Sequence, residues 1–468
     1  MSDKYKESQV IVVTGNKYEI DMINGSIMPK IVSFAVPLML STILQLMFNA
    51  VDLIVVGRFA GHDSLAAVGA TTALINLFVN VFVGISLGAN VCSARYFAKK
   101  DYEKMSEVVH TSILTALIAG FVIMILGGTF SKTVLTLMDT PANIIDKSVL
   151  YMRIYFIGTP FFMLYNFGAA ILRSVGDTKR PMVFLIIAGA LNAIFNLIFV
   201  TVFSMGVAGV AIATVISQGV SSSLVILTMC KNPKQYRLYF SKLKINLKIL
   251  KNIVTIGLPA GIQAASINFS NVLLQSSVNS FGEYAMAGYT AANNIFGFIY
   301  AAANAITQGC MTFTSQNLGA GKFDRLGRVL KDSIVLETLF CGIIGLFAYL
   351  FGPKILGIYS SEPQVAVYGM KVLSLTAITY FVCGYMDCLP GAMRGMGFSS
   401  VPMVLSIVGT VGMRVFWIYF IFPLHRDIQF LFASYPVSWL FTCILQVICY
   451  VIIRKKTAKT YSLKPVTA

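Results

Sequence analysis

One stretch in the first half of this chain returns, in altered form, 221 positions later. Residues 169–183 read AAILRSVGDTKRPMV and residues 390–404 read PGAMRGMGFSSVPMV. The identical positions are Arg173 with Arg394, Gly176 with Gly397, Pro181 with Pro402, Met182 with Met403 and Val183 with Val404. At an offset of 222, Pro37 and Asn49 correspond to Pro259 and Asn271. A repeat of half the chain length indicates that one folding unit was duplicated.

The composition places that unit in a membrane. Hydrophobic residues make up 57% of the chain and charged residues 12%, whereas soluble domains carry about 25% charged residues. Apolar runs long enough to cross the bilayer follow one another through the chain. We predict an all-α integral membrane protein with about twelve transmembrane helices. Their predicted ranges are 31–56, 65–93, 107–136, 144–172, 181–203, 206–230, 252–279, 284–314, 328–352, 364–392, 401–422 and 429–453.

The even number of spans in each half fixes the relation between the halves. Both halves enter the membrane from the same side, so the repeat is parallel and yields two six-helix lobes about an axis along the membrane normal. The predicted domains are a tail (1–30), the first lobe (31–230), a linker (231–251), the second lobe (252–453) and a second tail (454–468).

The net charge of +17 is distributed in a way that predicts orientation rather than nucleic-acid binding. Basic residues gather in alternate loops, near residues 99–104, 179–180, 231–251 and 322–328 and in both tails. By the positive-inside rule these loops and both termini are cytoplasmic. We expect a multi-pass monomer in the cell membrane, with lipid and not nucleic acid as its surroundings. The cysteines are single and the histidines scattered, so we expect no metal site and no cofactor.

Polar side chains inside the apolar runs are the candidate functional residues, because buried polar groups in membranes are costly. Gln45, Asn49 and Asp52 share one face of the first predicted helix. Asp52 could exchange a proton against sodium or a cationic substrate; alternatively it is solvated near a helix end or paired with Arg58. The amides and hydroxyl of Asn166, Asn192, Asn196 and Thr214 could complete a cation shell, or could join helices by hydrogen bonds.

The second half offers a different set. Asp387 and Arg414 lie in neighbouring predicted helices, and we interpret them as a buried charge pair, with a second coupling or gating site as the alternative. Glu337 lies about two turns from the start of its helix and fits ordinary interfacial solvation. Pro37 and Pro259 remove one backbone hydrogen bond each and permit helix bending at matching positions.

Several segments together resemble the multidrug and toxic compound extrusion (MATE) family over essentially the whole chain. They are NAVDLIVVGRFAGHDSLAAVGA (49–70), GISLGANVCSARYFAKKD (84–101), GVAGVAIATVIS (206–217) and the repeated loop motifs ILRSVGDTKRP and MRGMGFSSVP. The resemblance implies two six-helix lobes in a V and export of organic molecules in exchange for sodium or protons. It also implies a cation-coupling site of Asp52, Asn166, Asn192, Asn196 and Thr214.

This chain departs from the family at two places. Some members carry an acidic residue where this chain has Asn196. Others carry a glutamate in the seventh helix, where this chain offers only Gln263, Asn268 and Asn271. Gln263 and Asn271 are the two amides considered further. With Gln45 and Asn49, these two amides are the candidates for lining the substrate cavity.

The leading functional hypothesis is therefore a secondary antiporter of small cationic or amphiphilic compounds, driven by sodium or protons. A lipid-linked oligosaccharide flippase is the alternative, although such a protein would need several cavity arginines or lysines to hold pyrophosphate. A membrane-embedded enzyme would need clustered nucleophiles or metal ligands, which the sequence lacks. No phosphate-binding loop is found either.

The topology can be tested by labelling. In a cysteine-free background, a single cysteine replacing His62 or His425 should react with a membrane-impermeant maleimide applied to intact cells. Cysteines replacing Lys100, Phe240 or Asp324 should not react, because their loops are predicted to be cytoplasmic. External labelling at Phe240 would contradict the arrangement of two six-helix halves.

Overall fold

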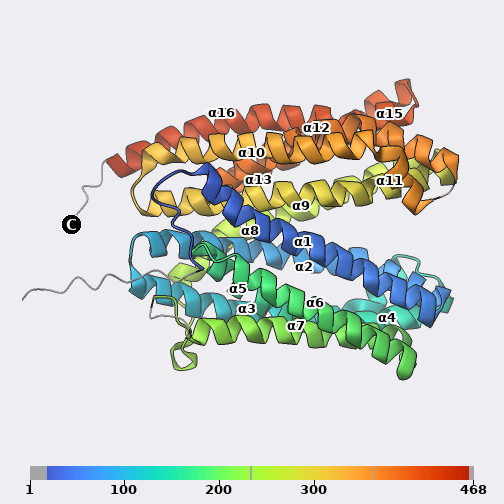
Figure 1. Ribbon diagram of the computed structural model, residues 1–468, viewed down its shortest axis with the longest axis horizontal. Coiled ribbons are helices and arrows are strands. Elements are labelled where there is room, and N and C mark those ends of the chain that lie inside the picture. Colours follow the sequence, from blue (N-terminus) through green and yellow to red (C-terminus); the bar gives the residue numbers. More distant parts are fainter. Residues whose placement is uncertain (1–17, 232–234, 361, 463–468) are drawn as a thin grey trace, which may run out of the picture.

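A computed structural model describes residues 18–231, 235–360 and 362–462. Long helices run side by side along the long axis of the molecule and form two bundles (Figure 1). In the first lobe, α1 (Met28–Val55) continues into the π-helical turn η1 (Val56–Ala60), and α6 (Lys179–Leu197) continues into the π-helical turn η2 (Ile198–Val202). The other helices of this lobe are α2 (His62–Ala98), α3 (Tyr102–Leu137), α4 (Ala142–Ile157), α5 (Thr159–Ser174) and α7 (Gly206–Lys231).

The second lobe follows a linker that contains the short helix η3 (Phe240–Lys242). Its first helices are α8 (Leu247–Asn279), α9 (Glu283–Gly319), α10 (Phe323–Leu350), α11 (Gly352–Tyr359) and α12 (Pro363–Gly395). The next span is composite and consists of α13 (Ser400–Ser406), the π-helical turn η4 (Ile407–Gly412), α14 (Met413–Phe416), the π-helical turn η5 (Trp417–Ile421) and η6 (Phe422–Leu424). The lobe ends with α15 (Ile428–Phe432) and α16 (Ser434–Ser462).

The predicted fold class is confirmed, with local differences. In the described part of the chain, 10 helices are long and apolar enough to cross a membrane, or 11 if α4 and α5 count as one span. These two helices meet at a bend of 45°, because Pro160 at the start of α5 cannot donate a backbone hydrogen bond. α9 is also long enough to cross a membrane, but its sequence is not apolar enough to be counted among these helices.

One further difference concerns the start of a helix. α8 begins at Leu247, before the predicted residue 252, because the Asn246 side chain accepts hydrogen bonds from the backbone N–H groups of Lys248 (3.0 Å) and Ile249 (3.3 Å). The linker before it packs into the first lobe, where Tyr236 and Leu238 are buried. The predicted tail of residues 1–30 lies partly outside the described residues.

The helix that opens each repeat begins in the opposite lobe. α1 crosses diagonally from one bundle to the other (Figure 1). Ile31 and Phe34 in its first half share a core with α9, α10 and α12, whereas Phe48 in its second half packs against Gly189 of α6. α8 does the reverse: Ile253 is part of the first lobe's core and Leu274 of the second lobe's core. Pro37 and Pro259 lie inside these two helices, and whether they act as hinges stays a prediction.

α2 and α8 touch backbone to backbone at the junction of the lobes. A Cβ atom on Gly84 would lie 2.4 Å from the Cα of Gly261, and one on Gly257 would lie 2.4 Å from the Cα of Ile85. Glycines spaced four residues apart on both helices permit this approach, as in other close helix pairs of membranes. The contact lies toward the end of the molecule where α1 begins and α16 ends, which we call the basic end.

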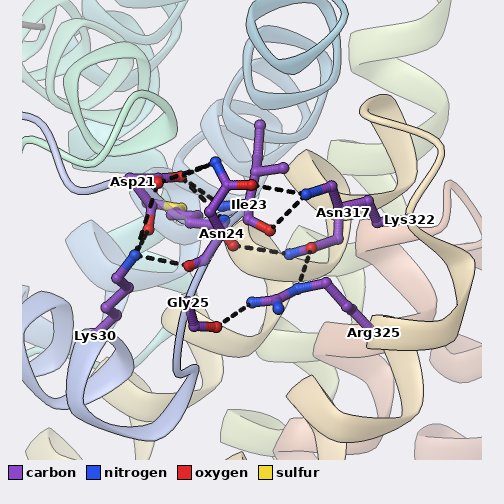
Figure 2. Close-up of polar contacts among 9 residues, drawn as sticks. Asp21, Ile23, Asn24, Gly25, Lys30, Asn317, Lys322 and Arg325 are labelled. Carbon is purple, nitrogen blue, oxygen red and sulfur yellow. Dashed lines mark hydrogen bonds and ion pairs between the residues drawn. The ribbon is translucent and has the colours of Figure 1, made fainter.

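A strap formed by residues 18–27 also joins the lobes at the basic end. On one side, Tyr236 of the linker donates a hydrogen bond to the Glu19 carboxylate (3.0 Å). On the other, Lys322 donates to the Asn24 side-chain oxygen (2.8 Å), as Figure 2 shows. Arg325 of α10 donates to the carbonyl oxygen of Gly25 (3.0 Å). Strap and glycine contact together hold the two lobes against each other at the basic end.

The glycine contact predicts the effect of one methyl group. Gly88→Ala would place its Cβ 2.0 Å from the carbonyl oxygen of Ile253. Since backbone cannot turn away as a side chain can, the lobes must shift, and we expect destabilisation of about 1–3 kcal/mol. The melting temperature of the purified protein in detergent measures this. Gly219→Ala on α7 is the matched control, because nothing lies within 4 Å of a Cβ at that position. Equal melting of the two variants would contradict the close contact.

Candidate functional site

A cavity of about 520 Å³ opens inside the first lobe, and we call it the N-lobe cavity. Its wall is formed by α1, α2, α4, α5, α6 and α7, with Asn304 and Gln308 contributed by α9 of the second lobe. The size is that of a drug-like ligand. The predicted polar residues found in the wall are Gln45, Asn49, Asp52, Asn166, Asn192 and Thr214.

The polar face of α1 lines this cavity from one end to the other. Ser41, Gln45, Asn49 and Asp52 all contribute to the wall. Their spacing repeats once per helical turn, so their side chains leave the helix on one side. The exposed apolar residues of α1, such as Leu46 and Ile54, belong to its other faces. The residues that the sequence places on one face of α1 thus lie together in this wall, and their part in binding stays a prediction.

Asp52 lies at the start of a chain of hydrogen bonds between helices. The Asn196 amide donates to the Asp52 carboxylate and also to the Asn192 side-chain oxygen (3.2 Å). Asn192 in turn donates to the Thr214 hydroxyl (3.3 Å), whose own hydrogen goes to the backbone carbonyl of Val210 (3.0 Å). One carboxylate, two amides and a hydroxyl from three helices thus converge on one side of the cavity.

The network leaves oxygen atoms available. The side-chain oxygen of Asn196 is buried and has no hydrogen-bond partner within the described chain. Among the described residues, no basic side chain lies within ion-pair distance of Asp52, and Arg58 is exposed instead. Carboxylate and amide oxygens are ligands for hard cations, so this corner can bind a proton or a small cation.

Asn166 is the one member of the predicted cation set that stands apart. It lines the cavity, but its amide donates to the Phe162 carbonyl one turn earlier in α5 (2.8 Å). Among the described residues, no hydrogen bond links it to Asp52 or to the asparagines of α6. Within the described structure it therefore contributes to the wall rather than to the hydrogen-bonded chain.

Sequence reasoning missed several residues of the wall. Tyr151 and Tyr155 of α4 line the cavity with their rings stacked, 6.2 Å between centroids. Their spacing of four residues was a usable signal, since it puts both rings on one helix face. Gln308 and Asn304 were not detectable in this way, because they come from the other lobe.

The predicted charge pair of Asp387 and Arg414 is not formed. Arg414 donates to the Asn271 side-chain oxygen of α8 (2.9 Å), and its guanidinium lies 4.1 Å from the ring centre of Tyr435. Arg394 on the same helix is the charged neighbour of Asp387. The π-helical turns η4 and η5 lie on either side of α14. Because a π-helical turn holds more residues than an α-helical turn, Arg414 lies on a different face from the one expected of a plain α-helix.

Gln263 and Asn271, the cavity candidates of α8, serve these buried arginines. Arg394 donates to the Gln263 side-chain oxygen (2.6 Å), and Arg414 binds Asn271 as described. Neither amide belongs to the wall of the N-lobe cavity. Both occupy positions where a neutral acceptor satisfies a guanidinium inside the second lobe.

Glu337 is not at the interface, which corrects the expectation of solvation. Its side chain is fully buried in α10, and the thiols of Cys341 (3.2 Å) and Cys388 (3.4 Å) donate to its carboxyl oxygens. Gly384 of α12 makes the room, since a Cβ there would lie 2.3 Å from a Glu337 oxygen. Among the residues that the structure describes, no group of three or more His, Cys, Asp or Glu could hold a metal ion.

Comparison with known proteins now decides the family. The MatE profile matches residues 37–198 and 259–420, one match for each repeat. The chain belongs to the MatE family. This confirms the resemblance drawn from the motifs and the duplication drawn from the repeated loop.

The relatives of this MatE protein extend over most of its length. It is 29% identical over 423 residues to "Probable multidrug resistance protein YoeA" of Bacillus subtilis (strain 168), which covers 88% of this chain and 91% of that protein. It is 26% identical over 407 residues to "Probable multidrug resistance protein YpnP" of the same strain, covering 85% and 88%. A solved structure, "Outward-facing conformation of a multidrug resistance MATE family transporter of the MOP superfamily", is similar with a TM-score of 0.86 at 21% identity, covering 94% and 98%.

The separation of Asp387 from Arg414 can be measured by a double-mutant cycle on melting in detergent. If the two side chains do not interact, the effects of Asp387→Asn and Arg414→Gln on stability should add to within about 0.5 kcal/mol. The control cycle combines Asp387→Asn with Arg394→Gln, for which we expect clear coupling because these charges are neighbours. Strong coupling with Arg414 and none with Arg394 would restore the original charge pair.

Proposed function

We propose that this protein is a secondary active exporter that exchanges small amphiphilic or cationic organic compounds for sodium ions or protons. The observation that carries the proposal is the Asp52 carboxylate in the wall of the N-lobe cavity, hydrogen-bonded to Asn196 and without a basic partner among the described residues. The names of the relatives YoeA and YpnP support export of drugs.

Exchange requires a group whose charge or occupancy changes during the cycle. The amides of Asn192 and Asn196 and the hydroxyl of Thr214 are neutral at every physiological pH. Asp52 can be ionised, protonated or bound to sodium. When the driving cation occupies Asp52, the site is neutral and releases a cationic or dipolar substrate. When the substrate arrives from the other side, it displaces the cation, and this mutual exclusion couples the two fluxes.

The contacts at the basic end fit an exporter in its outward-facing state. We propose that the basic end faces the cytoplasm of a cell whose membrane holds the protein, since its loops carry the lysines and arginines. The glycine contact and the strap then seal the cavity from the cytoplasm. We propose that in this state the N-lobe cavity communicates with the outside. The similar solved transporter is described as being in an outward-facing conformation.

The alternatives lack a specific observation. A flippase for pyrophosphate-linked oligosaccharides needs several cationic side chains in its cavity, and Arg173 is the basic residue of the described N-lobe wall. An enzyme needs a nucleophile with a base beside it, and the hydroxyls that line the cavity donate to backbone carbonyls, as Ser217 and Ser221 do. We propose that the protein acts as a monomer, without a cofactor or a nucleic-acid partner.

Replacement of the coupling carboxylate tests the function. In Asp52→Asn we expect folding near wild type, because the amide keeps the shape, and loss of efflux driven by a sodium or proton gradient. Substrate binding in detergent should become nearly independent of pH and sodium, since the linkage is removed. Fluorescent-dye efflux from inverted vesicles, with each gradient imposed separately, measures the first effect and identifies the ion.

Asp63→Asn is the matched control, since this carboxylate is half exposed and faces Lys147 at 3.9 Å, away from the cavity. Its efflux should equal that of the wild type. Gradient-driven efflux at the wild-type rate in Asp52→Asn would refute the coupling role.

A further inference from the structure

Arg173 brings a positive charge into the wall of the N-lobe cavity, which the exchange mechanism does not use. It lies at the end of α5, where its Nε donates to the Ala169 carbonyl (3.1 Å) and its Nη1 to the Gln308 side-chain oxygen of α9 (2.7 Å). Both acceptors are neutral. A guanidinium has five N–H donors and keeps its charge at any physiological pH, so these bonds leave the charge uncompensated.

No carboxylate of the described chain forms an ion pair with Arg173. Asp177, the nearest acidic residue along the chain, is bound by Arg180. The Nη2 of Arg173 makes no hydrogen bond within the described chain, yet it is not one of the buried atoms that lack a partner, and the half-buried side chain lines the cavity. The N–H groups that Arg173 does not use are therefore accessible from the cavity.

The duplication supplies an internal comparison. Arg394 occupies the corresponding position in the second lobe, and it also donates to a glutamine, Gln263. Seven residues before Arg394 stands Asp387, its charged neighbour; seven residues before Arg173 stands the neutral Asn166. The second lobe thus balances the charge of its arginine with a carboxylate, whereas the first lobe has a neutral amide at the corresponding position. Only the unbalanced arginine lines the cavity.

Arg173 and Asp52 lie at opposite ends of this cavity. Arg173 is the last residue but one of α5, next to the loop that leads into α6. Asp52 is bound by Asn196 near the other end of α6. Phe48, Phe162 and Tyr165 line the wall between the charged ends.

We propose that Arg173 is the anion subsite of the cavity and that it binds a carboxylate of the transported compound. The proposal rests on the export function above and narrows its substrate class to zwitterionic aromatic compounds. In the substrate-bound half of the cycle Asp52 has lost its driving cation, so the cavity carries one negative and one positive end. A dipolar substrate with an acidic group toward Arg173 balances both charges, whereas a simple cation leaves Arg173 unbalanced.

A matched pair of dyes tests the subsite. Tetramethylrhodamine carries a free carboxylate, and its methyl ester is the same fluorophore without that charge. Binding is measured by fluorescence polarisation in detergent and transport by efflux from vesicles. Wild type should favour the free acid, and Arg173→Gln should weaken its binding by about tenfold, the value of one charge-assisted hydrogen bond. Binding of the ester should change by less than about twofold, and Arg173→Lys should keep much of the preference.

Two controls separate charge recognition from structure. Arg153→Gln removes an exposed arginine of the same lobe, which donates to the Gly128 carbonyl (3.3 Å) outside the cavity, and should leave both affinities unchanged. Gln316→Ala breaks another contact between α9 and the end of α5, to the Ser174 carbonyl (2.6 Å) outside the cavity wall, and leaves the guanidinium of Arg173, so the preference for the acid should persist. If Arg173→Gln weakens both dyes equally, as a purely structural bridge would, the subsite is refuted.

The result also separates this proposal from the export function. Preferential binding of the acid without gradient-driven efflux of either dye would support the subsite and overturn the exporter. Efflux of both dyes with equal affinities in wild type and Arg173→Gln would support the exporter and overturn the subsite.

Discussion

The backbone contact between α2 and α8 is the constraint on which the arrangement of the lobes depends. Glycines at positions 84, 88, 257 and 261 bring the two helices so close that no side chain fits between them. Hydrophobic side chains give little net drive for association inside lipid, so close packing has to supply it. The lobes are therefore fixed at one end by shape, and they are free to diverge toward the other end.

Polar contacts from α9 reinforce the same end. Thr312 donates to the Asn90 side-chain oxygen (3.0 Å), Ser315 to the Val91 carbonyl (2.8 Å) and Gln316 to the Ser174 carbonyl (2.6 Å). Each of these bonds joins the second lobe to the first. In a low-dielectric setting satisfied bonds rigidify an interface, and unsatisfied ones are costly. Opening the basic end must break them together, which makes closure cooperative.

The sequence was sufficient for the fold class, the duplication and the family, because apolar length and repeated loop motifs depend on local sequence. It also placed the polar face of α1, since helix periodicity alone decides which side chains point the same way. The predicted partner of Arg414 was wrong, because the π-helical turns η4 and η5 change the helix face on which Arg414 lies, and no sequence pattern indicated them. The prediction for Glu337 was also wrong, because the room beside Gly384 is a tertiary feature.

The role of Arg173 shows a subtler limit. Its recurrence as Arg394 marked it as part of a repeat. What distinguishes the two arginines is a neutral neighbour in one copy and a charged neighbour in the other, together with the cavity that borders only the first. A sequence comparison between the halves finds the substitution at Asn166, but only coordinates reveal which arginine faces open space.

The crossing of α1 has a consequence for the order in which the protein is made. Ile31 and Phe34 leave the ribosome first, yet their neighbours in α9 and α10, such as Phe313 and Val329, come nearly three hundred residues later. The strap also lacks its partner early in synthesis, since Asn24 can bind Lys322 only after the second lobe has been made. During synthesis the opening helix therefore sits in the bilayer with its first half unpacked. The first lobe can complete its own core early, but α1 reaches its final position only after the second lobe has been synthesised.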